Sequence, residues 1–289
     1  MSAVLDRKAR ALLAECARAG EDCVVVVVDH VEGSVPRERG AAMLVGARAM
    51  AGTIGGGHLE LKSVAIAREM LSRKADATGG SIRRFPLGPA LGQCCGGVAH
   101  VAFHVCRAGI APPGLDLAAP AALFDLQLFG AGHVGQALVD VLAGVDCRIT
   151  WIDSREQQFP ERVPANARVE FSEAPQEEVA AAAANAFYLV MTHSHALDFA
   201  IVERILRRDD AGFIGLIGSQ TKRVTFERRL RERGISRAAV DRMVCPIGLP
   251  DITGKSPGVV AIAVAAQMLA VATARSGAQA VLAVIPRVR

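Results

Sequence analysis

The segment LFGAGHVGQAL, residues 128–138, decides the fold that we expect for the C-terminal part of the chain. It sets Gly130, Gly132 and Gly135 in a GxGxxG pattern between an apolar strand-like run and an apolar helix-like run. Asp153 ends the next strand-like run, WID, at about the spacing where a carboxylate would reach a ribose hydroxyl. This context predicts a Rossmann-type domain. The glycines either admit a ligand or serve only the turn and the packing of helix on strand.

Strand-like and helix-like runs alternate through the rest of this region. The strand-like runs are LQLFG, CRITWID, ARVEF, FYLVMTH and GFIGLIG, and between them lie a helix from about Val134, an alanine-rich helix, a further helix and a basic helix. Such alternation predicts a doubly wound parallel sheet.

The N-terminal part has a different pattern. It predicts an amphipathic helix that ends at Gly20, a helix over about 58–74, and strands at 24–28, 43–45, 82–85 and 98–105. Residues 107–120 carry three prolines and little periodicity. We therefore expect an α/β protein in which a smaller α+β domain (1–106) precedes a linker (107–125) and a Rossmann-like domain (126–289).

Composition narrows the function classes. The chain has 289 residues, of which 51% are hydrophobic and only 4% aromatic, and the formal net charge is +4. No basic stripe of the kind that nucleic acid requires is present. Seven cysteines without regular spacing favour a reducing compartment, and no signal peptide precedes Val4. The apolar run 259–274 contains Gln267 and predicts a buried helix. We expect a cytoplasmic protein that binds neither nucleic acid nor membrane.

The stretch AGTIGGGHLELK, residues 51–62, places Gly55, Gly56 and Gly57 at the start of the second expected helix. Glycines at a helix N-terminus leave backbone N–H groups accessible, so they suit a phosphate or another anion. A tight turn without a ligand is the alternative. Glu60 either caps the first turn of its own helix or accepts hydrogen bonds from a ring with several N–H donors.

Two further N-terminal motifs contain candidate binding residues. GQCCGG sets Cys94 and Cys95 between Gln93 and Gly96, a spacing unlike that of CxxC zinc or redox sites. Free amides in a glycine-rich loop would lower a thiol pKa and suit contact with a soft metal or with sulfur, whereas the alternative is a pair of inert buried thiols. In GSVPRERGA, Arg37 offers a planar fork that fits phosphate, or is merely solvated.

Histidines follow two of the expected strands of the C-terminal domain. His133 lies at the head of the helix after GAG, and His193 and His195 lie in MTHSHALD. All three should lie at the carboxyl edge of the sheet, where doubly wound folds bind ligands. We expect a polar rim rather than a metal site, because no third ligand with suitable geometry is evident. The sequence shows no Ser/His/Asp triad, no paired-carboxylate site and no Walker loop.

In this order, GSVPRERGAAMLV, GTIGGGHLE, GQCCGG, LFGAGHVGQAL, MTHSHALD and PIGLPDITGKSPGVVAIAVAAQML resemble the xanthine dehydrogenase accessory protein family, XdhC/CoxI, over nearly the whole chain. His58 and the paired cysteines look like the XdhC branch of that family. GSQTKR, residues 218–223, departs from the more basic run that the resemblance leads one to expect there.

The resemblance implies a chaperone and not an enzyme. Such a protein binds the molybdenum cofactor, assists its sulfuration by a cysteine desulfurase and delivers it to the molybdenum-binding subunit of xanthine dehydrogenase, and it looks like a homodimer. The cofactor-binding residues would be Arg37, Gly55, Gly56, Gly57, His58, Glu60, Gln93, Cys94, Cys95, Gly96, Gly130, Gly132, His133, Gly135, Asp153 and His193, with Cys94 and Cys95 nearest to molybdenum or its sulfur. The alternative function is an NAD(P)-dependent oxidoreductase that uses the Rossmann domain.

Overall fold

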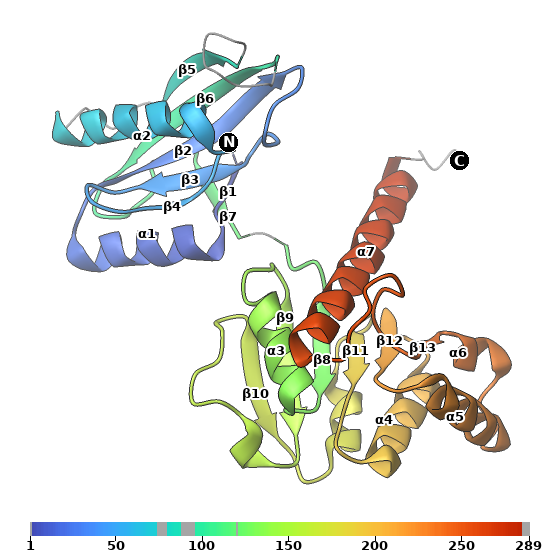
Figure 1. Ribbon diagram of the computed structural model, residues 1–289. Helices are drawn as coiled ribbons and strands as arrows, with labels where there is room; N and C mark the ends of the chain where they lie inside the picture. The colour runs from blue at the N-terminus through green and yellow to red at the C-terminus, as the bar shows by residue number, and fades with distance from the viewer. Residues whose placement is uncertain (1, 74–79, 88–95, 120, 285–289) are drawn as a thin grey trace. The chain divides into compact units, whose positions relative to one another are not determined.

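The chain is divided into two compact units, Met1–Ala121 and Ala122–Arg289 (Figure 1). A computed structural model describes residues 2–73, 80–87, 96–119 and 121–284, without the side chains of 276–284. The two units are described separately below.

The N-terminal unit contains a five-stranded antiparallel sheet. Its strands are β2 (Cys23–Glu32), β3 (Ala42–Val45), β4 (Met50–Gly52), β5 (Ser81–Pro86) and β6 (Val98–Cys106), in the order β4-β3-β2-β6-β5. The valine run of β2 is fully buried, as its unbroken β-branched sequence predicts.

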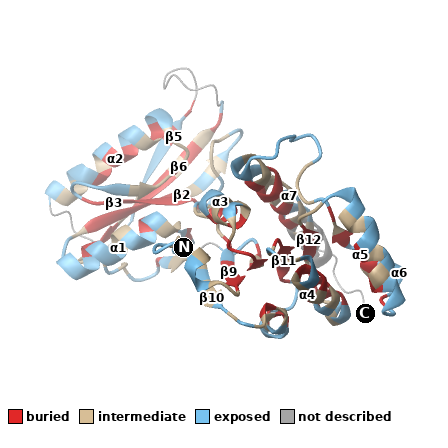
Figure 2. Ribbon diagram, turned by 60° about the horizontal axis from the view of Figure 1, so that its bottom comes forward, coloured by how far each residue is buried: buried red, intermediate tan, exposed pale blue. Residues whose placement is uncertain are grey.

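Helices α1 (Arg7–Ala19) and α2 (Gly57–Ser72) cover opposite faces of this sheet (Figures 1 and 2). Successive side chains of a strand point to opposite faces. Accordingly, Val24 and Val26 of β2 pack in one core with α2, and Val25 and Val27 pack in the other with α1. Gly20 ends α1 in the left-handed conformation, as predicted.

The region expected as a linker contains regular structure. Within 107–125, β7 (Asp116–Ala118) pairs in parallel with β1 (Ser2–Val4) at the start of the chain, and the unit boundary falls after Ala121. Neither short strand shows in the sequence pattern, because three residues are too few to display a period of two.

The C-terminal unit contains a six-stranded sheet in which every neighbouring pair is parallel. Its strands are β8 (Asp125–Phe129), β9 (Arg148–Asp153), β10 (Ala167–Phe171), β11 (Phe187–Val190), β12 (Phe213–Leu216) and β13 (Met243–Val244). Their spatial order is β10-β9-β8-β11-β12-β13. This is the doubly wound Rossmann order, in which the direction of winding reverses between β8 and β11. The predicted fold class is confirmed.

Helices cover both faces of the parallel sheet. The core on one face includes side chains of α3 (His133–Leu142) and α7 (Pro257–Val284), and the core on the other includes side chains of α4 (His195–Arg208), α5 (Gln220–Glu232) and α6 (Arg237–Asp241). Two short 3-10 helices, η2 (Glu156–Gln158) and η3 (Pro175–Ala181), complete the unit.

The alanine-rich α-helix expected before β11 is instead the 3-10 helix η3. Arg208 of α4 donates to the carbonyl oxygens of Val179, Ala180 and Ala182 at 2.6–3.0 Å. Because a guanidinium fork already satisfies these carbonyls, the segment does not need α-helical N–H donors there.

Helix α7 contains the apolar run that was expected to form a buried helix. It is the one helix in the described part of the chain whose length and composition would allow it to cross a membrane. Its buried residues, among them Ala261, Val264 and Met268, pack in the same core as α3, but only 33% of the apolar window is buried. The helix is therefore only partly buried, whereas a buried helix was expected, and Ile262 is exposed.

The Gly135→Ala substitution should destabilise the C-terminal unit. A Cβ on Gly135 would lie 2.2 Å from the carbonyl oxygen of Gly130, so the turn and the helix would have to separate. We expect a loss of about 1–3 kcal/mol in the free energy of unfolding, measured by urea denaturation followed by circular dichroism. Gly144→Ala is the matched control, because a Cβ there meets no atom within 4 Å. Equal stability of the two variants would contradict this account of the GxGxxG packing.

Candidate functional site

In the N-terminal unit, three loops lie against one another. Residues 33–37 follow β2, the glycine triplet leads into the first residue of α2, and Gly96–Gly97 precede β6. The N–H of Gly97 donates to the carbonyl oxygen of Ser34 at 3.1 Å. A Cβ on Gly55 would lie 2.6 Å from Cβ of Pro36 and 3.6 Å from Cγ of Arg37. The fold thus brings the loop that contains Arg37 against the glycine triplet and against Gly97, the neighbour of the predicted site residue Gly96.

The backbone explains the glycine triplet. Gly55, Gly56 and Gly57 have φ angles of 121°, 72° and 62°, in a region that side chains with a Cβ rarely adopt. Gly55 is further restricted by its contact with Pro36, whereas a Cβ on Gly56 would meet no atom within 4 Å. Three consecutive left-handed residues are therefore needed to make this turn, whether or not a ligand approaches it.

Glu60 supports the turn from within. Its Oε2 accepts hydrogen bonds from Oγ1 of Thr53 at 2.5 Å and from the N–H groups of Ile54 and Gly56 at 3.2 Å. Glu60 therefore stabilises the turn that precedes α2, and it does not cap the N–H groups of the first turn of its own helix, which was one of the two roles open to it in the sequence. A ring ligand would have to compete with these three donors for the same oxygen.

The start of α2 has unused hydrogen-bond donors. Within the described residues, the N–H groups of Gly57, His58 and Leu59 have no acceptor, and Gly57 and His58 are exposed. Arg37 lies beside the turn, and among the described residues its one ion pair is an exposed one with Glu38 at 3.2 Å. Open donors, the helix dipole and a nearby guanidinium can together hold an anion. Gln93, Cys94 and Cys95 lie outside the described residues.

The C-terminal unit presents the second candidate site, at the carboxyl edge of its sheet where the winding reverses. A Cβ on Gly130 would lie 2.3 Å from the carbonyl oxygen of Met191, just after β11. Gly130 and Gly135 are therefore required by packing, whereas a Cβ on Gly132 meets no atom within 4 Å. His133 and His193 are exposed at this edge, as expected from the topology.

Asp153 lies at the end of β9 as predicted, but both of its oxygens are engaged. Oδ2 accepts from the N–H of Ala131 at 2.6 Å and from Nη2 of Arg155 at 2.9 Å, and Oδ1 accepts from the N–H and Nε of Arg155 at 2.9 and 3.0 Å. Burial alone would raise the pKa of this carboxyl, but the hydrogen bonds from Arg155 and Ala131 outweigh it and lower the pKa below its ordinary value. Through its hydrogen bond from the N–H of Ala131, Asp153 stabilises the glycine loop between β8 and α3.

A second buried acid at this edge, Asp198, is absent from the sequence-based site. Its side chain is fully buried, and its Oδ1 accepts from the N–H and Oγ1 of Thr192 at 3.0 and 2.7 Å. Its Oδ2 accepts from Nζ of Lys222 at 2.6 Å, and Lys222 also donates to the carbonyl oxygen of Ile217. Asp198 and Lys222 occur within MTHSHALD and GSQTKR, so the motifs contain them without indicating that they pair.

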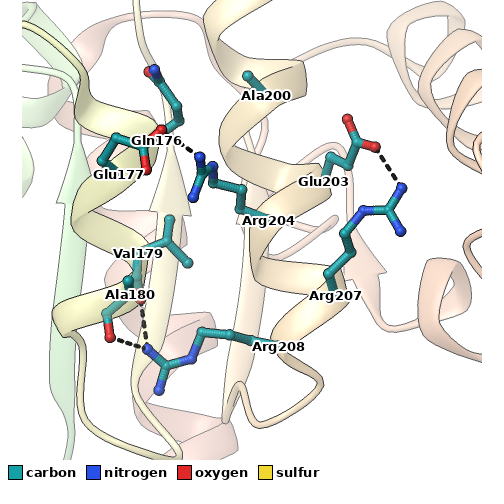
Figure 3. A pocket seen from close by; sticks show the side chains of 9 residues that line it. All are labelled: Gln176, Glu177, Val179, Ala180, Ala200, Glu203, Arg204, Arg207 and Arg208. Carbon is teal, nitrogen blue, oxygen red and sulfur yellow. Dashed lines mark hydrogen bonds and ion pairs between the residues drawn. The ribbon is translucent and has the colours of Figure 1, made fainter.

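No group of three or more His, Cys, Asp or Glu side chains is placed to hold a metal ion within the described ranges. A surface pocket of about 600 Å³ between η3 and α4 contains several arginines (Figure 3). Arg204 pairs with Glu177, and Arg207 pairs with Glu203 at 2.8 Å. Because these cations already have acidic partners, the pocket is a weaker anion site than either glycine-rich helix start.

The chain is similar to known proteins over both units. Residues 126–268 match the model of the XdhC Rossmann domain, and residues 16–85 match the XdhC and CoxI family. YqeB of Escherichia coli K12, an uncharacterized protein, is 28% identical over 256 residues, which are 87% of this chain and 44% of YqeB. The chain thus spans less than half the length of this relative.

A crystal structure of a protein from Bacillus halodurans, described as a xanthine dehydrogenase, has a similar fold. The TM-score is 0.72 at 20% identity, over 93% of this chain and 96% of the other. The two family matches cover the GGGHLE motif and the GxGxxG crevice respectively, so the protein belongs to the XdhC and CoxI family.

Proposed function

We propose that this protein binds the molybdenum cofactor, assists its sulfuration and delivers it to xanthine dehydrogenase, as a carrier and not as an enzyme. Membership of the XdhC and CoxI family supports a role in xanthine dehydrogenase maturation. Its partners would be the molybdenum-binding subunit of xanthine dehydrogenase and a cysteine desulfurase. A cytoplasmic homodimer is the form in which we expect it to act.

One observation carries the proposal. Helices α1, α4, α5 and α6 each have a side-chain N-cap, provided by Asp6, Ser194, Ser219 and Ser236. Helices α2 and α3 instead have Gly56 and Gly132 at this position, with no side-chain cap. A side-chain cap uses one of the four free N–H groups of the first turn. Among the six α-helices whose N-caps are described, the two without a side-chain cap begin at GTIGGGHLE and LFGAGHVGQAL, two of the motifs that carry the family resemblance.

The cofactor matches these open donors in charge. A pterin with a terminal phosphate and a metal dithiolene is anionic, and unpaired N–H groups at a helix start favour anions. In the N-terminal unit, Arg37 and the N–H groups of Gly57 and His58 would hold the phosphate or another anionic group. In the C-terminal unit, the first turn of α3 offers a second such surface, and there Asp153 and Asp198 are already neutralised by Arg155 and Lys222.

When bound, the cofactor would supply a molybdenum centre that accepts a terminal sulfur. The residues of this chain would bind it, orient it and exclude water from it. Cys94 and Cys95 are the thiols that we assign to contact with molybdenum or its sulfur, with Gln93 beside them.

The second candidate function is an NAD(P)-dependent oxidoreductase, which the GxGxxG loop and the Rossmann strand order favour. A dinucleotide would need an acidic oxygen for its ribose. Asp153 has four hydrogen bonds within the protein, so it would have to release Arg155 or Ala131 to make that contact. This competition makes a dinucleotide the weaker candidate.

Cofactor retention tests the carrier function. Purified protein is mixed with released molybdenum cofactor, and bound molybdenum is measured by mass spectrometry after gel filtration. We expect retention by the wild type, and about tenfold weaker binding by Arg37→Ala, because a hydrogen bond to a charged group is lost. Arg39→Ala, an exposed arginine of the same loop, is the matched control and should bind like the wild type. The proposed carrier function would be contradicted if the wild type retained no cofactor, or if both variants bound the cofactor equally more weakly than the wild type.

Reactivation tests delivery separately from binding. Addition of the loaded protein to apo-xanthine dehydrogenase should restore activity more completely than free cofactor at the same concentration. Retention without any gain in reactivation would limit the role to storage.

Trp151 fluorescence tests the dinucleotide alternative. Trp151 is buried and donates from Nε1 to the carbonyl oxygen of Gly130 at 3.0 Å, so it reports on the glycine loop. We expect no saturable quenching by NADH or NADPH up to about 1 mM, which corresponds to a binding free energy weaker than about −4 kcal/mol. Micromolar quenching that Asp153→Asn abolishes would favour the oxidoreductase.

A further inference from the structure

Three cysteines from separate elements meet in the N-terminal unit. Cys16 lies on α1, Cys23 begins β2 and Cys106 ends β6, and all three belong to the core under α1. The register of the antiparallel pair places Cys23 directly opposite Cys106. Directly opposed residues in such a pair have Cα atoms about 4.5–5.5 Å apart, within the range of about 4.4–6.8 Å that a disulfide spans.

Hydrogen bonding distinguishes the two opposed thiols. The Cys23 thiol donates towards Cys106, which raises the pKa of Cys23 and lowers the pKa of Cys106. Burial raises the pKa of Cys16. Of the three, Cys106 is thus the thiol most ready to become a nucleophilic thiolate, and Cys23 is placed to react with it next.

Helix α1 packs on the core that contains this pair, together with residues that follow β6 such as Leu115. Cys23 and Cys106 have no exposed surface, and Cys16 has 4%. The helix contributes two buried residues, Ala9 and Cys16, and two partly buried ones, Leu12 and Leu13, to this core. Its first turn is held by the Asp6 cap on the N–H of Ala9 at 2.8 Å. A helix with so few buried contacts is expected to detach at lower free energy than the sheet beneath it unfolds.

We propose that Cys23 and Cys106 are a peroxide-oxidisable pair that forms a reversible disulfide when α1 opens. The thiolate of Cys106 attacks one oxygen of a hydroperoxide, the O–O bond breaks, and Cys106 becomes a sulfenic acid while hydroxide or alkoxide leaves. The sulfur of Cys23 then attacks that of Cys106, the S–O bond breaks, and water leaves with the proton of Cys23. The two thiols lose two electrons in total, and the hydroperoxide gains them.

A Cys23–Cys106 disulfide would affect the N-terminal candidate site because of its position in the sheet. Cys23 and Cys106 lie at one end of β2 and β6, and the loops 33–37 and 96–97 lie at the other end of the same strands. The closed loop contains the glycine triplet and the whole N-terminal candidate site. The disulfide would therefore restrict the segment that carries the site, and the inference does not depend on which ligand that site binds.

Peptide mapping tests the pairing. The reduced full-length protein is treated with hydrogen peroxide, alkylated, digested without reductant and analysed by mass spectrometry. We expect a Cys23–Cys106 linked peptide, lighter than the two free peptides by two hydrogen atoms and lost on treatment with dithiothreitol. Linked peptides from the adjacent Cys94 and Cys95 are distinguished by mass.

Cysteine substitutions identify which thiols form the linked peptide. Cys23→Ser and Cys106→Ser should abolish the linked peptide, with Cys23→Ala and Cys106→Ala as second variants if either serine protein fails to fold. Cys147→Ser should form the bond as the wild type does, because Cys147 lies in the other unit. The proposal is overturned if folded wild type gives no Cys23–Cys106 peptide, or if Cys16–Cys23 is the main linkage.

The rate tests the role of α1. Asp6→Ala removes the N-cap and should speed formation of the linked peptide about fivefold, the factor that corresponds to a typical lost cap. Arg10→Ala, an exposed change on the same helix, should leave the rate unchanged. Equal rates for wild type and Asp6→Ala would overturn the gating by α1.

Discussion

The C-terminal unit depends on two buried carboxylates at the point where its strand order reverses. Asp153 holds the N–H of Ala131 just after β8, and Asp198 holds the N–H of Thr192 just after β11. Each carboxylate is neutralised by a cation, and the Asp198–Lys222 pair is nearly dry, with side-chain exposures of 0% and 9%. Removal of one partner from such a pair typically costs about 3–5 kcal/mol, because a buried charge is left alone. Both turns of the crevice are therefore fixed before any ligand arrives.

Because these turns are fixed without a ligand, the N-cap residues of α2 and α3 can be interpreted in terms of ligand binding. A glycine N-cap is only a few tenths of a kcal/mol less stabilising than serine or aspartate. Leaving the starts of α2 and α3 without a side-chain cap therefore has a small effect on stability, but it keeps first-turn donors available to an outside acceptor. In α2 the carboxylate of Glu60 stabilises the turn from Thr53 to Gly56 by accepting hydrogen bonds from it. It does not use the N–H groups of Gly57 and His58. Support of the loop and presentation of donors are thus carried out by different groups.

The sequence predicts those parts of the structure whose signal is local. Apolar strand-like runs that alternate with helix-like runs predict the parallel sheet, and GxGxxG after the apolar run LQLFG predicts the crevice. It does not predict features that need partners distant in sequence. Asp198 and Lys222 are 24 positions apart, and Cys23 and Cys106 meet only through the register of β2 and β6. The 3-10 form of η3 likewise depends on Arg208 of a later helix. For Glu60 the sequence offers two roles, a cap on its own first turn and an acceptor for a ring, whereas its hydrogen bonds go to the turn before α2.

The hydrogen bonds of Asp153 bear on how a Rossmann fold changes its ligand. An ionised carboxylate has about four lone-pair sites. In Asp153 these sites accept four hydrogen bonds from Ala131 and Arg155. The carboxylate therefore stabilises the glycine loop and has no lone-pair site left for a ligand. What remains accessible at the crevice is the first turn of α3, with Gly132 open and His133 exposed. Because Asp153 is hydrogen-bonded within the protein, the crevice binds a ribose diol less well. The free N–H groups of the first turn of α3 still favour an anion. The same strand order and glycine pattern are thus compatible with a carrier of an anionic cofactor, because the acid that would read the sugar holds the protein instead.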